Sequence, residues 1–197
     1  MTGDAGNDAT AQYSDQGLLG SIFVGPYLDL SSEFAYCLDN GEGVAVGYVL
    51  GALDTRAFNE RCTKYWSALA GKYENISAYN DQEQNLIRSE LLPKICSTDP
   101  SHVSVSASLP DYATIYPSHL HIDLLPSFQH LGYGSIMIET LLSKLRRHGS
   151  TGVHLVQAAS NQRAYAFYCK LGFTQVATTG TGTGSSSGDD IIMAMKL

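Results

Sequence analysis

The feature that most constrains the fold is that the spacing of apolar residues differs before and after one short loop. From Ile115 to Leu125, polar and apolar residues alternate, which predicts a strand with one buried face. From about Gly134 to His148, apolar residues instead recur every three or four positions, which predicts an amphipathic helix. Strand, loop and helix in direct succession indicate the α/β class. The polar face of the predicted strand consists of His119, His121 and Asp123.

The remaining patterns complete a single domain, as expected for a chain of 197 residues. Residues 1–16 are polar and rich in Gly, Ala and Asp, so we predict a flexible segment there and one domain over residues 17–197. The expected elements are a short helix and a turn (17–32), a β-hairpin (34–39 and 44–53), two helices (58–73 and 81–92), a loop (97–112), the strand and helix above, a strand (153–158), a helix (161–171) and a final hairpin (173–177 and 191–197) joined by the Gly/Thr/Ser-rich residues 178–188.

Charge and composition exclude several classes of function. The net charge is −7, and eight acidic residues precede the first basic one, Arg56, which disfavours nucleic-acid binding. The acidic residues before Arg56 would suit a cationic substrate such as an amine, or simply keep the protein soluble. No apolar run is long enough for a membrane span, and the first residues do not resemble a signal peptide. Four widely spaced cysteines favour free thiols in a reducing compartment, so we expect a cytoplasmic protein.

The loop between the predicted strand and helix is the candidate binding element. Gly132 and Gly134 stand where the helix begins, so the main chain there can approach a ligand without obstruction by a Cβ. Free N–H groups at a helix start suit a pyrophosphate, although an ordinary helix-initiating loop has the same appearance. A P-loop is excluded because no Gly-Lys-Ser/Thr follows. A dinucleotide fold is excluded because its longer glycine motif and first-strand position are absent.

Two motifs around this loop resemble the GNAT superfamily of N-acetyltransferases. Gln129-x-x-Gly132-x-Gly134, after a strand that ends in Leu-x-Pro, is similar to the acetyl-CoA signature of that superfamily. The segment from Asn161 to Phe173 is similar to its later helix, Asn-x-x-Ala-x-x-Phe-Tyr-x-x-x-Gly-Phe. The resemblance implies an α/β fold with a mixed, mostly antiparallel sheet, splayed between the fourth and fifth strands and flanked by helices. It also implies an enzyme that uses acetyl-CoA and needs no metal.

The likeness narrows to the C-terminal acetyltransferase-like domain of O-GlcNAcase and its stand-alone microbial relatives. It covers about residues 18–197 and includes the segments 24–33, 47–54, 62–66 and 116–123. The animal domain has a degenerate signature and is regarded as a pseudo-acetyltransferase. Here Gln129, Gly132 and Gly134 are all present, so we expect cofactor binding. Residues 1–16 show no strand pattern, so either the first GNAT strand is missing or the helix before the hairpin is short.

The resemblance also implies roles for individual residues. Tyr168 would protonate the leaving thiolate, and Asp123 would accept a proton from the substrate ammonium. Asp54 and Trp66 would join Asp123 in binding the substrate. A backbone N–H near Leu124 would stabilise the oxyanion. The expected cofactor-binding residues are Leu124, Leu125, Gln129, His130, Leu131, Gly132, Tyr133, Gly134, Ser135, Asn161 and Tyr168.

Structural roles remain open beside these functional ones. Tyr168 and Trp66 fit a packed core, Asn161 fits a helix N-cap, and Asp123 fits a structural pair. The acceptor is expected to be a small-molecule or peptide amine, such as the amino sugar glucosamine. A lysine of a protein or histone tail is the alternative enzymatic acceptor. The non-enzymatic alternative is an inactive domain that binds CoA or a partner.

Overall fold

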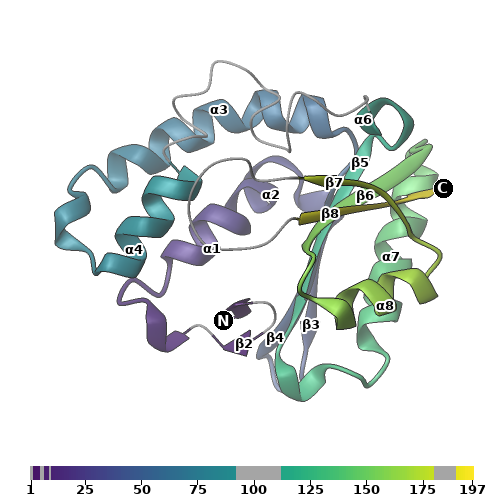
Figure 1. The fold of residues 1–197 in the computed structure, drawn as a ribbon, viewed down its shortest axis with the longest axis horizontal. Helices are drawn as coiled ribbons and strands as arrows, with labels where there is room; N and C mark the ends of the chain where they lie inside the picture. Colours follow the sequence, from purple (N-terminus) through teal and green to yellow (C-terminus); the bar gives the residue numbers. More distant parts are fainter. Residues whose placement is uncertain (1, 5–6, 9, 92–111, 180–189) are drawn as a thin grey trace.

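The computed structural model describes residues 2–4, 7–8, 10–91, 112–179 and 190–197. Its centre is a six-stranded sheet in the order β3-β4-β5-β6-β8-β7, and Figure 1 shows helices on both faces. All neighbouring strands are antiparallel except β5 and β6, so the sheet is mixed and mostly antiparallel, as predicted. The strands are β3 (Ala35–Asp39), β4 (Ala45–Ala52), β5 (Ser118–Leu124), β6 (Gly152–Ala158), β7 (Thr174–Thr179) and β8 (Asp190–Lys196).

One face of the sheet carries α7 (Tyr133–Arg147) and α8 (Gln162–Lys170). The buried stripe of α7 is formed by Ile138, Leu141, Leu142 and Leu145, each at most 2% exposed, which confirms the predicted helix and its face. A fully buried leucine or isoleucine stabilises the fold by about 1.5–3 kcal/mol. This stripe therefore fixes α7 against β3, β4 and β5 and determines where the helix begins.

The opposite face is covered by α1 (Leu18–Phe23), α2 (Gly25–Leu30), α3 (Thr55–Lys72) and α4 (Asp81–Leu86), as Figure 1 shows. These helices form a second apolar cluster around Trp66, Phe58 and Tyr73. A five-residue π-helix, Ile87–Leu91, continues α4, so the predicted helix over 81–92 is present up to Leu91. The sheet thus separates two cores, one on each face.

Three local predictions were wrong. The predicted turn near Gly25 is instead the start of α2, because Pro26 in the first turn of a helix loses no hydrogen bond. Tyr112–Ile115 forms a short helix, α6, rather than the start of the strand. Residues 2–4 and 7–8 pair as two short strands, β1 (Thr2–Asp4) and β2 (Asn7–Asp8), separate from the main sheet.

Among the described residues, the six-stranded sheet begins at β3, and no earlier described strand pairs with it. Shortly after these strands in the sequence, Ser14 and Asp15 contact α4 through the carboxylate of Glu83. Ser14 donates to this carboxylate at 2.8 Å and the Asp15 N–H at 2.7 Å. Glu83 is also the N3 residue of a capping box with Asn80. The flexibility of residues 1–16 and the boundary at residue 17 stay predictions.

The predicted β-hairpin is confirmed. Asp39 Oδ1 accepts the Gly41 N–H at 2.6 Å, and Gly41 and Gly43 have φ of 90° and 82°, a conformation that favours glycine. The loop predicted over 97–112 and the connection predicted over 178–188 lie largely outside the described residues. Cys37, Cys62 and Cys169, the cysteines within the described part, are unpaired thiols.

Candidate active site

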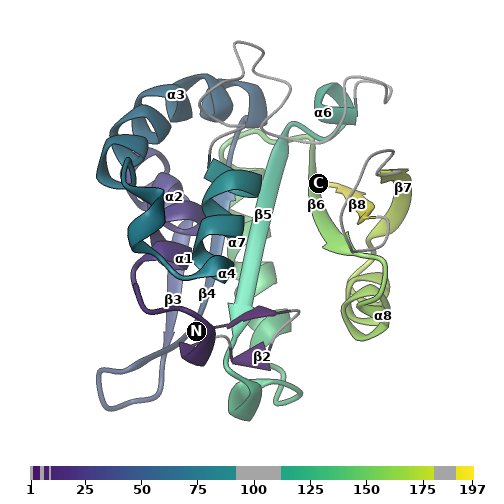
Figure 2. The same ribbon diagram turned by 60° about the vertical axis from the view of Figure 1, so that its left-hand side comes forward.

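The two parallel strands β5 and β6 diverge, and this divergence creates the site. Ser118 pairs with Val153 and His119 with His154. Beyond His119, no described residue of β5 pairs with β6, whereas β4 stays paired with β5 as far as Leu124. Figure 2 shows the two strands together at one end and apart at the other. The predicted splay is present, and it separates the third and fourth strands of this sheet in chain order, because the sheet begins at β3. The free edge of β5 can pair with an extended ligand.

The loop after β5 brings a helix start to the open end of this divergence. Gly132 is the N-cap of α7 with φ of 89°, and its position carries no side-chain cap. His130 also has a positive φ, 61°. The first N–H groups of a 15-residue helix are therefore not covered by a capping side chain, and the positive end of the helix dipole adds to them. This cradle fits the diphosphate of coenzyme A.

Gln129 has a structural contact as well as its predicted cofactor role. Its Nε2 donates to the Leu124 carbonyl at 2.9 Å, which ties the loop to the end of β5. The carbonyl of Leu124, a residue expected to bind the cofactor, therefore already accepts one hydrogen bond. We conclude that Gln129 helps to fix the shape of the loop, and direct contact of Gln129 with the cofactor stays a prediction.

Helix α8 places the two motif residues that the sequence singled out. Asn161 is the N-cap of α8 and accepts the Ala164 N–H at 3.1 Å. Tyr168 is buried beside Phe167 and Phe173, with ring centroids 5.3 and 5.7 Å away. The Tyr168 hydroxyl makes no hydrogen bond to a described residue. Burial raises the pKa of this phenol, and the Asp123 charge adds to the effect, so Tyr168 keeps its proton at neutral pH.

Asp123 lies on the face of β5 opposite to α7, as predicted. Burial raises its pKa to about 7, although a hydrogen bond from the Leu124 backbone opposes the change. The charge of Asp123 also raises the pKa of Tyr48 and of Tyr168. Asp123 is the cross-strand partner of Tyr48 in the pairing of β4 with β5. A carboxyl group that titrates near neutral pH suits proton transfer.

A cavity of about 260 Å³ lies on the α1–α3 face of the sheet, where β5 and β6 separate. We call it the β5–β6 cavity; its lining comes from α1, α2, α3, β5 and β6. Four aromatic side chains form much of the wall. They are Phe23, Tyr27, Phe58 and Trp66.

Three histidines line the same cavity, and the sequence placed two of them, His119 and His121, on this face. Burial lowers the pKa of His119 to about 3 and that of His121 to about 4. Burial also lowers the pKa of His154, the third histidine. All three rings are therefore neutral at neutral pH. His154 and Thr55, which both contact His119, were missed, because their proximity to His119 depends on contacts between distant parts of the chain.

The two remaining predicted substrate residues differ in position. Trp66, 3% exposed, belongs both to the apolar cluster and to the wall of the β5–β6 cavity. Asp54 is an exposed N-cap of α3 whose Oδ1 accepts the Ala57 N–H at 2.9 Å. It is not among the residues that line the cavity. The structure thus gives Asp54 a capping contact, and its substrate role stays a prediction.

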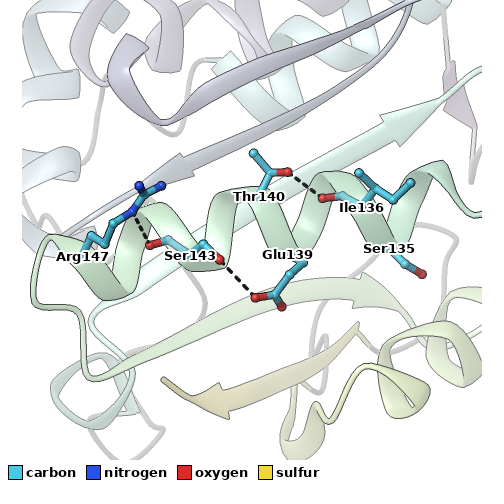
Figure 3. Close-up of a pocket in the computed structure, with 6 residues that line it drawn as sticks. All are labelled: Ser135, Ile136, Glu139, Thr140, Ser143 and Arg147. Carbon is cyan, nitrogen blue, oxygen red and sulfur yellow. Dashed lines mark hydrogen bonds between the residues drawn. The ribbon is translucent and has the colours of Figure 1, made fainter.

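A larger hollow, of about 590 Å³, follows the outer face of α7 from Ser135 to Arg147, and Figure 3 shows its residues. All of its lining residues come from this one helix. The polar side chains of Thr140, Ser143 and Arg147 bond to Glu139 or to the helix backbone (Figure 3), as in the 3.1 Å contact of Ser143 with Glu139. Because a single helix provides no opposing wall, the smaller β5–β6 cavity is the candidate reaction site.

The described part of the chain shows neither a bilayer-spanning helix nor a cluster of metal ligands. None of the described helices combines the length and the apolar character that a bilayer-spanning segment requires. Within the same residues, His, Cys, Asp and Glu side chains do not gather in threes as metal ligands would.

Comparisons with known proteins agree with this geometry. Residues 104–173 match the Acetyltransferase (GNAT) family. The structure is similar to the crystal structure of SsHAT, with a TM-score of 0.76 and 34% sequence identity over 99% of this chain and 88% of that one. The sheet and helices are also similar in fold to Naa20 of Chaetomium thermophilum, crystallised with a bisubstrate analogue, with a TM-score of 0.50 and 15% identity over 93% of this chain and 83% of that one.

The curated relatives are much longer proteins. The chain is 26% identical to the Protein O-GlcNAcase of Rattus norvegicus and to that of Mus musculus over 166 residues, which is 83% of this chain but 17% of each relative. The likeness to O-GlcNAcase thus concerns one region of those proteins. From the match to the family and from SsHAT, the chain belongs to the GNAT family of acetyltransferases.

Proposed function

We propose that the protein transfers the acetyl group of acetyl-CoA directly to a primary amine bound in the β5–β6 cavity. One observation carries the proposal: three features follow one another along the divergence of β5 and β6. They are the helix start at the left-handed Gly132, which has no side-chain cap, the free edge of β5, and the cavity with its neutral histidines. GNAT acetyltransferases use acetyl-CoA, which supplies an acetyl thioester with a good leaving group.

The residues that would hold the cosubstrate follow from this arrangement. The backbone N–H groups of residues 131–134 would bind the diphosphate, since the Ser135 N–H already donates to the Gly132 carbonyl at 3.1 Å. The free edge of β5 over Ile122–Leu125 would pair with the pantetheine amides as a further strand would. Asn161 can cap α8 and contact the cosubstrate at once, because an amide has two donors besides its oxygen.

Asp123 and Tyr168 would divide the proton transfers. The carboxylate of Asp123 accepts a proton from the substrate ammonium and passes it to water, which leaves a nucleophilic amine. A backbone N–H near Leu124 stabilises the negative charge that develops on the carbonyl oxygen. As the bond between nitrogen and the acetyl carbon forms and the bond between that carbon and sulfur breaks, Tyr168 donates its proton to the sulfur. Nitrogen loses a proton to water, and the tyrosinate regains one.

Two features suggest which amine is the acceptor. The similarity to O-GlcNAcase is the reason to include an amino sugar such as glucosamine, and the acidic first quarter of the chain is the reason to include a peptidyl lysine. A domain that binds CoA without transferring acetyl is the non-enzymatic alternative. A cytoplasmic location also remains a proposal.

Calorimetry with acetyl-CoA, followed by thiol release over a panel of amines, tests the proposed function. We expect saturable binding of acetyl-CoA at one site and turnover with at least one amine above the rate of thioester hydrolysis. Binding without turnover of any amine would favour the non-enzymatic alternative. Absence of binding would contradict both.

Gly132→Ala should weaken acetyl-CoA binding about 10-fold, because a residue with a Cβ at φ of 89° costs about 1–2 kcal/mol in that conformation and the loop would change shape. The matched control is Gly149→Ala at the other end of α7, where φ is 85° and a Cβ would likewise meet nothing within 4 Å. Both variants should lose similar thermal stability. Equal dissociation constants in the two would remove Gly132 from the cofactor cradle.

A further inference from the structure

The outer edge of β3 has no strand beyond it in the described part of the chain, and Figure 2 shows β3 at one side of the sheet. The strand contains no Lys, Arg or Pro, the residues that often keep a sheet edge from pairing with another chain. A register shift interrupts the other edge strand, β7, between Gln175 and Ala177, whereas the shift in the β3–β4 ladder falls only at its last pair. Of the two edges, β3 is therefore the one that can accept a further strand.

The pairing of β3 with β4 shows which of its backbone groups face outward. The Asn40 N–H donates to the Val44 carbonyl at 3.1 Å, so residue 40 bonds toward β4. Hydrogen bonds alternate along an antiparallel strand. Every second residue before Asn40 therefore bonds toward β4 as well, and the residues between them direct their backbone groups away from the sheet. The outward residues are Ala35, Cys37 and Asp39.

The outward groups form a self-complementary set. The Ala35 N–H is already used, because it donates to the Ser32 carbonyl. Among the described residues, no backbone partner is found for the Ala35 carbonyl, for either group of Cys37 or for the Asp39 N–H. These groups match a second copy of β3 that runs antiparallel with Cys37 opposite Cys37. Each Cys37 N–H then meets the other Cys37 carbonyl, and each Asp39 N–H meets the Ala35 carbonyl of the second copy.

The apolar side chains of β3 fit the same register. Tyr36 and Leu38 both pack, partly buried, against the core under α7. With Cys37 opposite Cys37, each Tyr36 lies directly opposite Leu38 of the second copy, in the closer type of antiparallel pair. Contacts between side chains directly opposite each other are what stabilises paired strands. Two such apolar pairs would continue the core of one copy into that of the other.

The two ends of β3 differ in charge. The hairpin end carries the exposed acids Asp39 and Glu42. The other end lies beside the last turn of α7, because the Phe34 and His148 rings contact each other edge-on with centroids 5.2 Å apart. That turn contains Lys144, Arg146 and Arg147.

The basic end keeps an excess of positive charge. Arg146 is paired with Glu139 at 2.8 Å, and Glu33, exposed near the start of β3, offsets one of the two other bases. An antiparallel second copy places the acidic end of each strand against the basic end of the other. A parallel copy would place like ends together, and a uniformly basic peptide would meet the basic end. The charges therefore favour an antiparallel second copy.

We propose that the outer edge of β3 binds a second copy of this chain, antiparallel and with Cys37 opposite Cys37, so that the two sheets become continuous. The inference goes beyond the proposed function, and β4 and β5 separate this interface from the divergence of the sheet. Because a strand of five residues gives a small interface, we expect a weak dimer with a micromolar dissociation constant rather than an obligate one.

Analytical ultracentrifugation under reducing conditions tests the association. We expect the average mass to rise from monomer toward dimer between about 1 and 100 µM protein. Cys37→Lys should weaken the dimer at least about fivefold, because two like charges would lie directly opposite each other on paired strands. Cys37→Val should keep the dissociation constant within about twofold, since the register needs no thiol.

The matched control is Cys169→Lys, which changes another exposed thiol, on α8. It should associate as the wild type does. Equal dissociation constants for Cys37→Lys and Cys169→Lys would place the interface away from β3 and overturn the inference. A wild-type protein that stays monomeric at about 100 µM would overturn it as well.

Thiol cross-linking locates the contact in a protein with an unchanged β3. Residues opposite each other in a hydrogen-bonded antiparallel pair have Cα atoms about 5.5 Å apart, within reach of a short bismaleimide, which adds to two thiols. Cys169→Ser should give the same cross-linked dimer as the wild type, and Cys37→Ser should give none. Equal yields in these two variants, or no cross-linked dimer in any of the three proteins, would contradict the proposed register.

Discussion

Tyr168→Phe is expected to lower kcat for acetyl transfer about 100-fold, the lower end of what a positioned general acid contributes. The change removes one oxygen from a buried ring and leaves the contacts with Phe167 and Phe173 in place. The hydroxyl has no hydrogen bond to a described residue, so its loss leaves no buried partner unsatisfied. Acetyl-CoA affinity, measured by calorimetry, should change less than about twofold.

Tyr165→Phe is the matched control for this variant. Tyr165 lies on the same helix and packs, partly buried, against the same core, so it reports any general effect of losing a phenol from α8. It should keep the wild-type rate. If Tyr168→Phe turned over as fast as Tyr165→Phe, the sulfur would receive its proton from another group, and Tyr168 would be a core residue only.

Asp123→Asn should lower kcat/KM about 100-fold at pH 8 and remove the inflection near pH 7 from its pH profile. The sign follows from the raised pKa of about 7: the carboxylate accepts a proton only when ionised, so the wild-type rate rises as pH passes through that value. Above pH 7 the amine itself continues to deprotonate, so both proteins should share a further rise. Asp29→Asn, an exposed change on α2, is the control.

The same variant should be more stable than the wild type at pH 8. Because the folded-state pKa of Asp123 is raised from 3.8 to about 7, the unfolded chain ionises first, and the free energy of unfolding falls as pH rises from about 4 to about 7. Asparagine carries no charge to bury, so its advantage appears above this interval and vanishes near pH 4. Lower activity together with a higher melting temperature at pH 8 would identify a carboxylate retained for chemistry. Equal melting temperatures at both pH values would contradict its burial.

Elements with a strong hydrophobic period could be predicted from the sequence. The alternation in β5 and the leucine stripe of α7 determine which face of each is buried, and together with the glycine loop they indicate where the cofactor cradle lies. Pro26 was ambiguous, because proline fits both a turn and the first turn of a helix. The start of β5 was placed too early because Ile115 fits a strand by propensity, whereas Pro117, which cannot donate a ladder hydrogen bond, precedes the strand itself.

The chemistry of the site depended on contacts that no local pattern reveals. The bond between Thr55 and His119 joins residues 64 positions apart. The raised pKa of Asp123 and the lowered pKa values of the histidines arise from burial, which depends on the whole fold. Gln129 belongs to a recognised motif, but its contact with the Leu124 carbonyl depends on the folded shape of the loop, which the motif does not reveal.

The divergence of β5 from β6 has a consequence for the protein between turnovers. A stretch of strand without a neighbour presents the same backbone groups that drive edge-to-edge association of sheets. Here that stretch lies inside a sheet, flanked by an apolar cavity, and the pantetheine of acetyl-CoA would cover it. If the pantetheine pairs there as proposed, the cosubstrate would act as a further strand, and we expect protein stripped of coenzyme A to aggregate more readily than the complex.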